Sequence, residues 1–334
     1  MQCTQSGTET DHTILNNSIN TLMDIVFNPL IENCGFKQEY VEQEKENIKK
    51  IINSKIDNKD QYALDRCIEE MYKDKPYGLY KYGCTKDLDN ISASGLYEYY
   101  KELISTAKID IFVSGDFDEN NVTKTIKDLK IIQDLNERDA NYIPNTNNVG
   151  SGLDQTAESH TVTETMDVTQ GKLVLGLKIN ETNGNCKFIA SMYNAILGGT
   201  ANSKMFQNVR EKESLAYTAN SIYIRQKNNV YIRCGIEINN YQKTVDIIKI
   251  QLEDMKNGMF KDEDVTNAKK YITSSVKMLA DEQESSITYF IANELSNSQL
   301  SIEDYIDNVD KVTKEQIVGL AKTINLEMIY FLRD

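Results

Sequence analysis

Alternating apolar and polar residues are clearest in the second half of the chain, where they predict a sheet. Leu173, Val174, Leu175, Leu177 and Ile179 form a short apolar run that favours a strand. Residues Ala216–Arg225 and Val230–Ile238 are predicted to form a hairpin joined at Asn228-Asn229, because the later strand is apolar at every second position. We therefore expect one face of this sheet to lie in the core and the other to face water.

Apolar residues at helical spacing surround these strands and predict helices that pack on the sheet. The predicted helices cover 187–197, 203–212, 245–255, 265–279, 287–295 and 314–324. Gly198-Gly199 follows the earliest of them, as a helix stop or a tight backbone contact rather than a phosphate-binding loop. The chain ends on an apolar strand, Leu326–Leu332.

Residues 138–160 are rich in Asn, Gly, Ser and Thr and carry little periodic hydrophobicity, which is typical of a linker. This segment divides the chain into an N-terminal unit, 1–137, and a C-terminal unit, 161–334. The total length of 334 residues also favours two domains over one.

The N-terminal unit repeats the later part of the C-terminal one. Phe36–Val41 aligns with Phe260–Val265 at an offset of 224, and a helical stripe over Leu15–Val26 precedes it as 245–255 precedes Phe260. Ser92 begins a helix followed by an apolar strand at Ile109–Val113, as Thr313 does before Leu326, at offsets of 221 and 217. Such self-similarity indicates the duplication of one α/β unit.

Compared with the C-terminal unit, the N-terminal unit lacks residues at its beginning. In the C-terminal unit 99 residues (161–259) precede Phe260, whereas only 35 precede Phe36, so the first copy is short by about 64 residues. The predicted fold class is α+β, with two tandem units whose antiparallel-rich sheets carry helices on one face. The first unit should lack its opening strands and helices, so that an apolar face is left uncovered. Either translation begins late or the chain is a fragment.

Charge and cysteine content restrict the function classes. The formal net charge of −14 argues against a nucleic-acid surface, and no apolar run is long enough to span a membrane. The opening residues do not resemble a signal peptide, so we expect a cytoplasmic protein. The six cysteines form no C-x-x-C pair, and we expect them to be reduced packing residues.

The most specific stretch runs from Leu197-Gly198-Gly199 to Arg210-Glu211 and Leu215-Ala216-Tyr217. It resembles the C-terminal domain signature of pitrilysin/insulinase-type proteins, the inverzincin family that includes the mitochondrial processing peptidases. In the first half, Lys75-Pro76-Tyr77-Gly78 and Val113-Ser114-Gly115-Asp116 are similar to the family's N-terminal domain. The resemblance covers the chain from about Leu15.

The finer resemblance is to the paired bacterial type, in which one subunit keeps the zinc site and a sister subunit has lost it. It rests on Asn58-Lys59-Asp60, Tyr62-Ala63 and Arg66-Cys67, followed by Met71. This resemblance implies a zinc-bearing sister subunit as partner and a peptide or small protein as substrate. The sister would hold the zinc, and no cofactor is expected in this chain.

An inverzincin needs His-x-x-Glu-His on one helix, so that two imidazoles bind zinc while the Glu activates water. The chain contains only His12 and His160, neither in such a motif, and we expect both to be solvated. Seven residues after Glu44, where the resemblance implies the third ligand, stands Ile51, which cannot bind zinc. Lys49 and Lys50 are no better ligands, and Glu46 would lie on another helix face. The prediction is therefore no catalytic and no metal residue.

Arg210 and Tyr217 are the candidate substrate-binding residues, because the resemblance implies that the matching pair reaches toward the substrate. An ion pair of Arg210 with Glu211 or Glu213, and packing of Tyr217 on the sheet, is an equally open structural interpretation. The sequence thus predicts a non-catalytic subunit that pairs with a zinc-bearing sister and helps enclose a peptide. The alternatives are a fragment of a genuine zinc endopeptidase and a scaffold without peptide binding.

Overall fold

The computed structural model describes residues 12–129, 132, 159–181, 183–296 and 298–334. The chain forms two compact units: unit 1 is Met1–Asn53 with Tyr82–Thr146, and unit 2 is Ser54–Lys81 with Asn147–Asp334. The predicted N-terminal unit 1–137 is therefore interrupted, because the structure places Ser54–Lys81 with the C-terminal half. Except for its last two residues, the predicted linker 138–160 lies outside the described residues.

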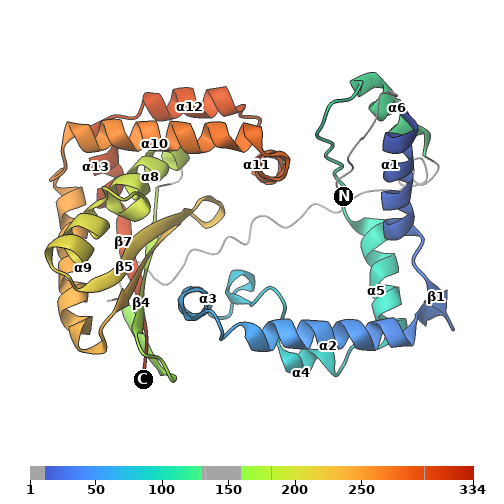
Figure 1. Cartoon of the computed structure of the whole chain (residues 1–334), viewed down its shortest axis with the longest axis horizontal. Helices are drawn as coiled ribbons and strands as arrows, with labels where there is room; N and C mark the ends of the chain where they lie inside the picture. The colour runs from blue at the N-terminus through green and yellow to red at the C-terminus, as the bar shows by residue number, and fades with distance from the viewer. Residues whose placement is uncertain (1–11, 130–131, 133–158, 182, 297) are drawn as a thin grey trace. The chain divides into compact units, whose positions relative to one another are not determined.

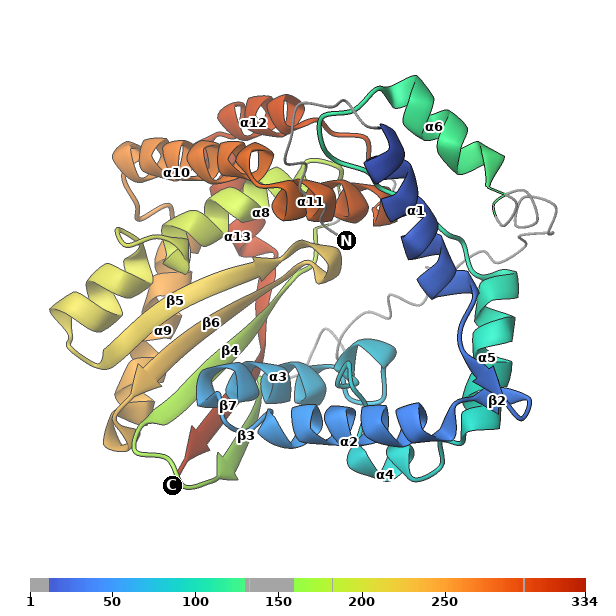
Figure 2. The ribbon, with the colours of Figure 1, turned by 45° about the vertical axis from the view of Figure 1, so that its right-hand side comes forward.

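Unit 2 is built on a five-stranded sheet with the order β3-β7-β4-β6-β5 (Figure 2). Its strands are β3 (His160–Thr165), β4 (Gly171–Ile179), β5 (Ala216–Ile224), β6 (Asn229–Ile236) and β7 (Ile324–Arg333). All neighbours are antiparallel except β3 and β7, which are parallel. The antiparallel-rich sheet and the predicted hairpin are confirmed, and His160 begins β3 instead of lying in the linker.

Helices cover one face of this sheet and bury the alternating apolar side chains of β4 and β6 (Figure 1). They are α8 (Cys186–Asn194), α9 (Tyr241–Lys256), α10 (Asp262–Asp281), α12 (Ile302–Asp310) and α13 (Lys314–Lys322), while α11 (Gln283–Leu295) packs against α10. All but α12 were predicted from the apolar spacing. The helix α12 is short and begins at a capping box in which Ser301 and Asp304 bond each other's backbone amides.

The expectation of a wet second face is wrong, because α3 (Lys59–Met71) packs on it. Ala63, Cys67 and Met71 recur every fourth residue along α3 and form one apolar stripe. This stripe lies against side chains such as Tyr231, which is fully buried on the face opposite to the main core. A segment distant in sequence thus covers a face that the strand pattern alone assigns to solvent.

Two π-helical segments replace the regular helices expected near the glycine pair. The helix α8 continues directly into η3 (Ala195–Gly199), and η4 (Met205–Lys212) follows after a short turn. At Gly198 an added Cβ would lie 2.6 Å from the backbone nitrogen of Ser221, so β5 approaches η3 closely only because no side chain intervenes. The interpretation of Gly198-Gly199 as a helix stop with tight backbone contact is confirmed.

Unit 1 consists of helices with a single two-stranded sheet among its described residues. Its main elements are α1 (His12–Phe27), β1 (Ile31–Glu32), β2 (Gly35–Phe36), α2 (Gln38–Ser54), α4 (Thr85–Leu88), α5 (Ala93–Thr106) and α6 (Glu119–Asp128). The predicted strand at Ile109–Val113 does not form. Its counterpart β7 lies between β3 and β4, whereas no described strand of unit 1 pairs with 109–113.

The five described cysteines are all free thiols, and Cys67, Cys186 and Cys234 are buried. These three agree with the interpretation of the cysteines as packing residues, whereas Cys34 and Cys84 are exposed. Within the described part of the chain, no helix has both the length and the apolar character needed to cross a bilayer.

Candidate functional site

Arg210 and Tyr217 lie on either side of the turn that leads from η4 into the edge strand β5. The guanidinium of Arg210 stacks over the Phe206 ring at 4.6 Å, and its Nε is 3.7 Å from a carboxylate oxygen of Glu211. Both members of that ion pair are exposed, so the pair is weak and leaves donors of Arg210 directed to solvent.

Tyr217 occupies a β-bulge. Ala216 pairs with Ile236 and Thr218 pairs with Gly235, so Tyr217 has no partner of its own on β6. The hydroxyl of Thr218 accepts a hydrogen bond of 3.1 Å from the Gly235 amide. Tyr217 is 62% exposed, and the bulge therefore presents a phenol to solvent at the end of the sheet instead of packing it on a strand.

This geometry can recognise an extended backbone. The strand β5 is the last of the sheet, with β6 as its one strand neighbour in the described part of unit 2. An edge strand offers unpaired backbone groups, to which an extended peptide can add as a further strand. A guanidinium and a phenol beside such an edge can donate hydrogen bonds to peptide carbonyl oxygens. Neither group needs to change its ionisation state to do so.

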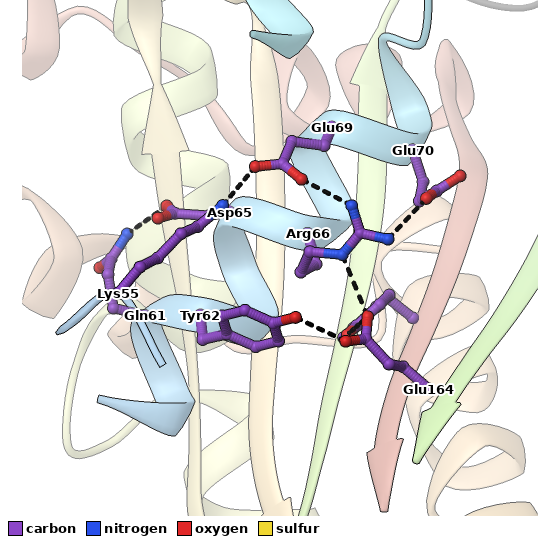
Figure 3. A network of polar contacts seen from close by, with 9 residues as sticks. Lys55, Gln61, Tyr62, Asp65, Arg66, Glu69, Glu70 and Glu164 are labelled. Carbon is purple, nitrogen blue, oxygen red and sulfur yellow. Dashed lines mark hydrogen bonds and ion pairs between the residues drawn. The ribbon is translucent and has the colours of Figure 1, made fainter. Parts of the chain in front are cut away.

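A second cluster of polar side chains attaches α3 to the sheet (Figure 3). Arg66 donates from Nε to Glu164 of β3 at 3.0 Å and from its two terminal nitrogens to Glu69 at 2.6 Å and Glu70 at 2.8 Å. The other oxygen of Glu164 accepts from the Tyr62 hydroxyl at 2.5 Å. Figure 3 shows Tyr62 and Arg66 meeting Glu164, with Glu69 and Glu70 beside the Arg66 guanidinium.

Hydrogen bonding and burial set the ionisation of this cluster. Burial tends to raise the pKa of Glu164, but hydrogen bonds from Tyr62, Tyr330 and Arg66 outweigh it and lower that pKa. Burial, followed by the bond to Glu164, raises the pKa of the Tyr62 phenol to about 12. Glu164 is thus a firmly ionised acceptor held by neutral phenols and a cation, which suits attachment of α3 and not proton transfer.

The sequence does not mark this cluster as an attachment of α3. Its visible signal is the spacing of Arg66 with carboxylates three and four residues later, which indicates an ion-paired helix face. Nothing in that spacing indicates that the face also binds Glu164, about a hundred residues away. A buried pair extends the same contact, since the Tyr72 hydroxyl lies 2.8 Å from the Asn229 side-chain oxygen on β6.

The described residues do not fit a zinc site. Ile51 lies on α2 with a partly exposed aliphatic side chain, which offers no ligand atom. His160 is exposed at the start of β3. No three His, Cys, Asp or Glu side chains converge as a metal site within the described ranges, and His12 lies among residues whose side chains are not described.

Comparisons with a family model and with individual proteins both identify peptidase-like relatives. Residues 90–272 match the family model described as Peptidase M16 inactive domain. The chain is 34% identical over 321 residues to "Probable inactive metalloprotease YmfF" of Bacillus subtilis, covering 96% of this chain and 74% of that protein. It is 22% identical over 317 residues to "Uncharacterized zinc protease YmxG" of the same organism, with 93% of this chain and 73% of that protein covered.

A solved structure shows the same fold. A conserved protein from Enterococcus faecalis superposes with a TM-score of 0.83 at 25% sequence identity, over 97% of this chain and 75% of that one. The tandem α+β architecture predicted from the sequence therefore has a close structural precedent.

Proposed function

Because the chain belongs to the M16 peptidase family as a non-catalytic member, we propose that it pairs with a zinc-bearing sister subunit and helps enclose a peptide. The observation that carries this proposal is the exposed pair Arg210 and Tyr217 beside the edge strand β5. A chain without zinc ligands can still hold substrate, because peptide recognition needs only hydrogen-bond donors and a strand edge.

Two further features support pairing. The relatives found in Bacillus subtilis include one protein named as an inactive metalloprotease and another named as a zinc protease. Unit 1 exposes many large apolar side chains, a property of surfaces that other proteins cover. The free thiols match a reducing compartment, and we place the protein in the cytoplasm on this ground. A scaffold without peptide binding is less well supported, since it leaves the exposed Tyr217 without a role.

Two conservative variants test the proposal. Arg210→Lys keeps the charge but loses the planar donor geometry, and Tyr217→Phe loses only the hydroxyl. Because both side chains are exposed, each variant should keep the wild-type melting temperature. Each should weaken binding to a zinc-bearing M16 relative from the same organism, measured with a peptide present, by on the order of 1 kcal/mol.

A matched control is Lys212→Arg, which alters an exposed side chain of η4 and should leave both quantities unchanged. Unchanged affinity in Arg210→Lys and Tyr217→Phe, together with a lower melting temperature, would show that the pair is structural. The absence of any complex between the wild-type chain and zinc-bearing relatives would refute the pairing.

A further inference from the structure

Unit 2 contains a pocket of about 310 Å³ between α9, α13 and the adjoining ends of β4 and β7. We call it the unit 2 pocket. All of its lining residues lie in unit 2, so one compact unit forms it. Its volume falls at the lower end of the range of small-molecule sites. The aliphatic lining residues are Leu177, Leu252, Ala321, Ile324 and Leu326.

Tyr193 of α8 brings a phenol to this pocket. The residue is 1% exposed, and burial alone raises the pKa of its phenol, with no hydrogen bond or charge contributing. The Tyr193 hydroxyl has no hydrogen-bond partner among the described residues. The described side-chain atoms that are both unpaired and sealed from solvent belong to Asn293 and Glu327 instead. The Tyr193 hydroxyl is therefore unpaired but accessible, and the space that it reaches is the unit 2 pocket.

A water molecule fits the interior of this pocket poorly. A buried water typically makes about three hydrogen bonds, whereas the polar lining residues besides Tyr193 are Lys249, Glu253 and Lys256, all on α9. These three side chains are at least partly exposed, which places them at the mouth. A ligand with an apolar body and one polar atom for Tyr193 matches the interior better than water does, because it leaves no buried hydroxyl unpaired.

The charges at the mouth favour an anion. Lys256 Nζ lies 2.6 Å from a carboxylate oxygen of Glu253, so these two charges largely offset each other. Lys249 lies on the same helix and has no ion-pair partner within the described part of the chain. It leaves one uncompensated positive charge at the mouth, on a chain whose formal net charge is −14. A single carboxylate would compensate that charge.

We propose that the unit 2 pocket binds a small monocarboxylate with an apolar body and a hydroxyl group at the end remote from the carboxylate. The carboxylate pairs with Lys249 at the mouth, the apolar body contacts the aliphatic lining residues, and the hydroxyl forms a hydrogen bond with Tyr193. A phenol that stays neutral can donate or accept this bond. The inference involves neither Arg210 nor Tyr217 and does not depend on a partner subunit.

The probe is para-hydroxyphenylpropionate, whose rigid ring loses little conformational entropy on binding. It is titrated into the whole chain by isothermal titration calorimetry, and phenylpropionate, which lacks only the hydroxyl, is the matched ligand. We expect saturable binding of the hydroxylated acid and about fivefold weaker binding of phenylpropionate, because one hydrogen bond is lost. A lack of saturable binding, or equal affinity of both acids, would overturn the proposal.

Tyr193→Phe tests the hydrogen bond inside the pocket. Because the hydroxyl has no partner among the described residues, the variant should keep or raise the wild-type melting temperature. The two acids should bind this variant with equal affinity, since the group that distinguishes them is gone. If the two acids still differ, or if the melting temperature falls, the Tyr193 hydroxyl does not serve a ligand and the proposal fails.

Lys249→Met tests the mouth of the pocket. It should weaken the binding of both acids about two- to fivefold, as expected for the loss of an exposed ion pair. The control is Lys277→Met, which makes the same change in net charge at an exposed lysine of α10 outside the pocket and should bind both acids like the wild type. Equal losses in the two variants would indicate a general effect of charge, and unchanged binding in Lys249→Met would remove the carboxylate contact. Either result would overturn the proposal.

Discussion

Units 1 and 2 share a repeated sequence pattern but bury it to different extents. Both α5 and α13 begin at a side-chain cap, with Ser92 accepting a hydrogen bond from the Gly95 amide and Thr313 accepting one from the Gln316 amide. Beyond the caps the helices differ, because α13 packs into the core and α5 leaves Leu96 exposed. A local pattern is therefore sufficient to start a helix, whereas its burial depends on the elements around it.

The strands show the same contrast more strongly. β7 pairs with a neighbour on each side, so its backbone amides and carbonyls are satisfied in the sheet. The corresponding residues Ile109–Val113 alternate in the same way, yet Ile109 and Ile111 are exposed and no strand forms. A strand, unlike a helix, obtains its hydrogen bonds from other segments, and its formation therefore depends on partners.

The largest expected effect comes from matched substitutions in the two helices. Ile317→Ala removes a fully buried side chain from the core of unit 2 and should lower the free energy of unfolding by about 2–5 kcal/mol. Leu96→Ala at the corresponding position should cost less than about 1 kcal/mol, because that side chain is already partly in water. Urea unfolding followed by circular dichroism measures both.

Equal losses for Ile317→Ala and Leu96→Ala would contradict the difference in burial between the two units, since they would mean that Leu96 is as well packed as its counterpart.

An intermediate effect is expected at Glu164, which attaches α3 to the sheet of unit 2. Glu164→Gln removes the ion pair with Arg66 and should lower the free energy of unfolding by about 1–3 kcal/mol near neutral pH. The folded pKa of Glu164 lies below its ordinary value of 4.5. Its stabilising contribution is therefore complete above the ordinary pKa and is lost as the pH falls through the lowered folded pKa.

Urea unfolding at about pH 7 and at progressively more acidic pH measures the free energy of unfolding of the wild type and of Glu164→Gln. The difference between the two should become smaller as the pH falls. The control in unit 1 is Glu46→Gln, whose ion pair with Lys49 is long and exposed and should contribute little at any pH. If the difference in the free energy of unfolding between wild type and Glu164→Gln stays constant across the acidic range, the Glu164 carboxylate is not stabilised in its charged form.

The smallest effect concerns Lys45 of α2 and Lys269 of α10, which correspond at the offset of 224 and each donate a hydrogen bond to a backbone carbonyl. Lys45→Met and Lys269→Met each remove one hydrogen bond to a backbone carbonyl, so each should lower the free energy of unfolding by about 0.5–1.5 kcal/mol. Parallel denaturant titrations of the two variants provide the measurement. Losses of similar size would support the alignment of α2 with α10, whereas a loss confined to one variant would show that the lysines are not structurally equivalent.

The sequence alone determined much of this protein. Helical spacing located α9 and α10, and the alternation of β6 together with Asn228-Asn229 located the hairpin. Ile51 and the two unplaced histidines led to the prediction that the chain holds no zinc. These features are local, because a few consecutive residues carry each signal. The duplication could also be predicted from the sequence, because aligning the chain with itself at offsets of 217 to 224 brings the repeated segments together.

The remaining features depend on contacts between distant segments, which the structure shows. It placed α3 on the far face of the unit 2 sheet, through an apolar stripe and the Arg66–Glu164 contact that link residues about a hundred positions apart. It also put Tyr217 in a bulge at the sheet edge and left 109–113 without a strand partner. The physical reason is the same in each case: burial and strand pairing depend on which distant segments meet, and no local pattern records that.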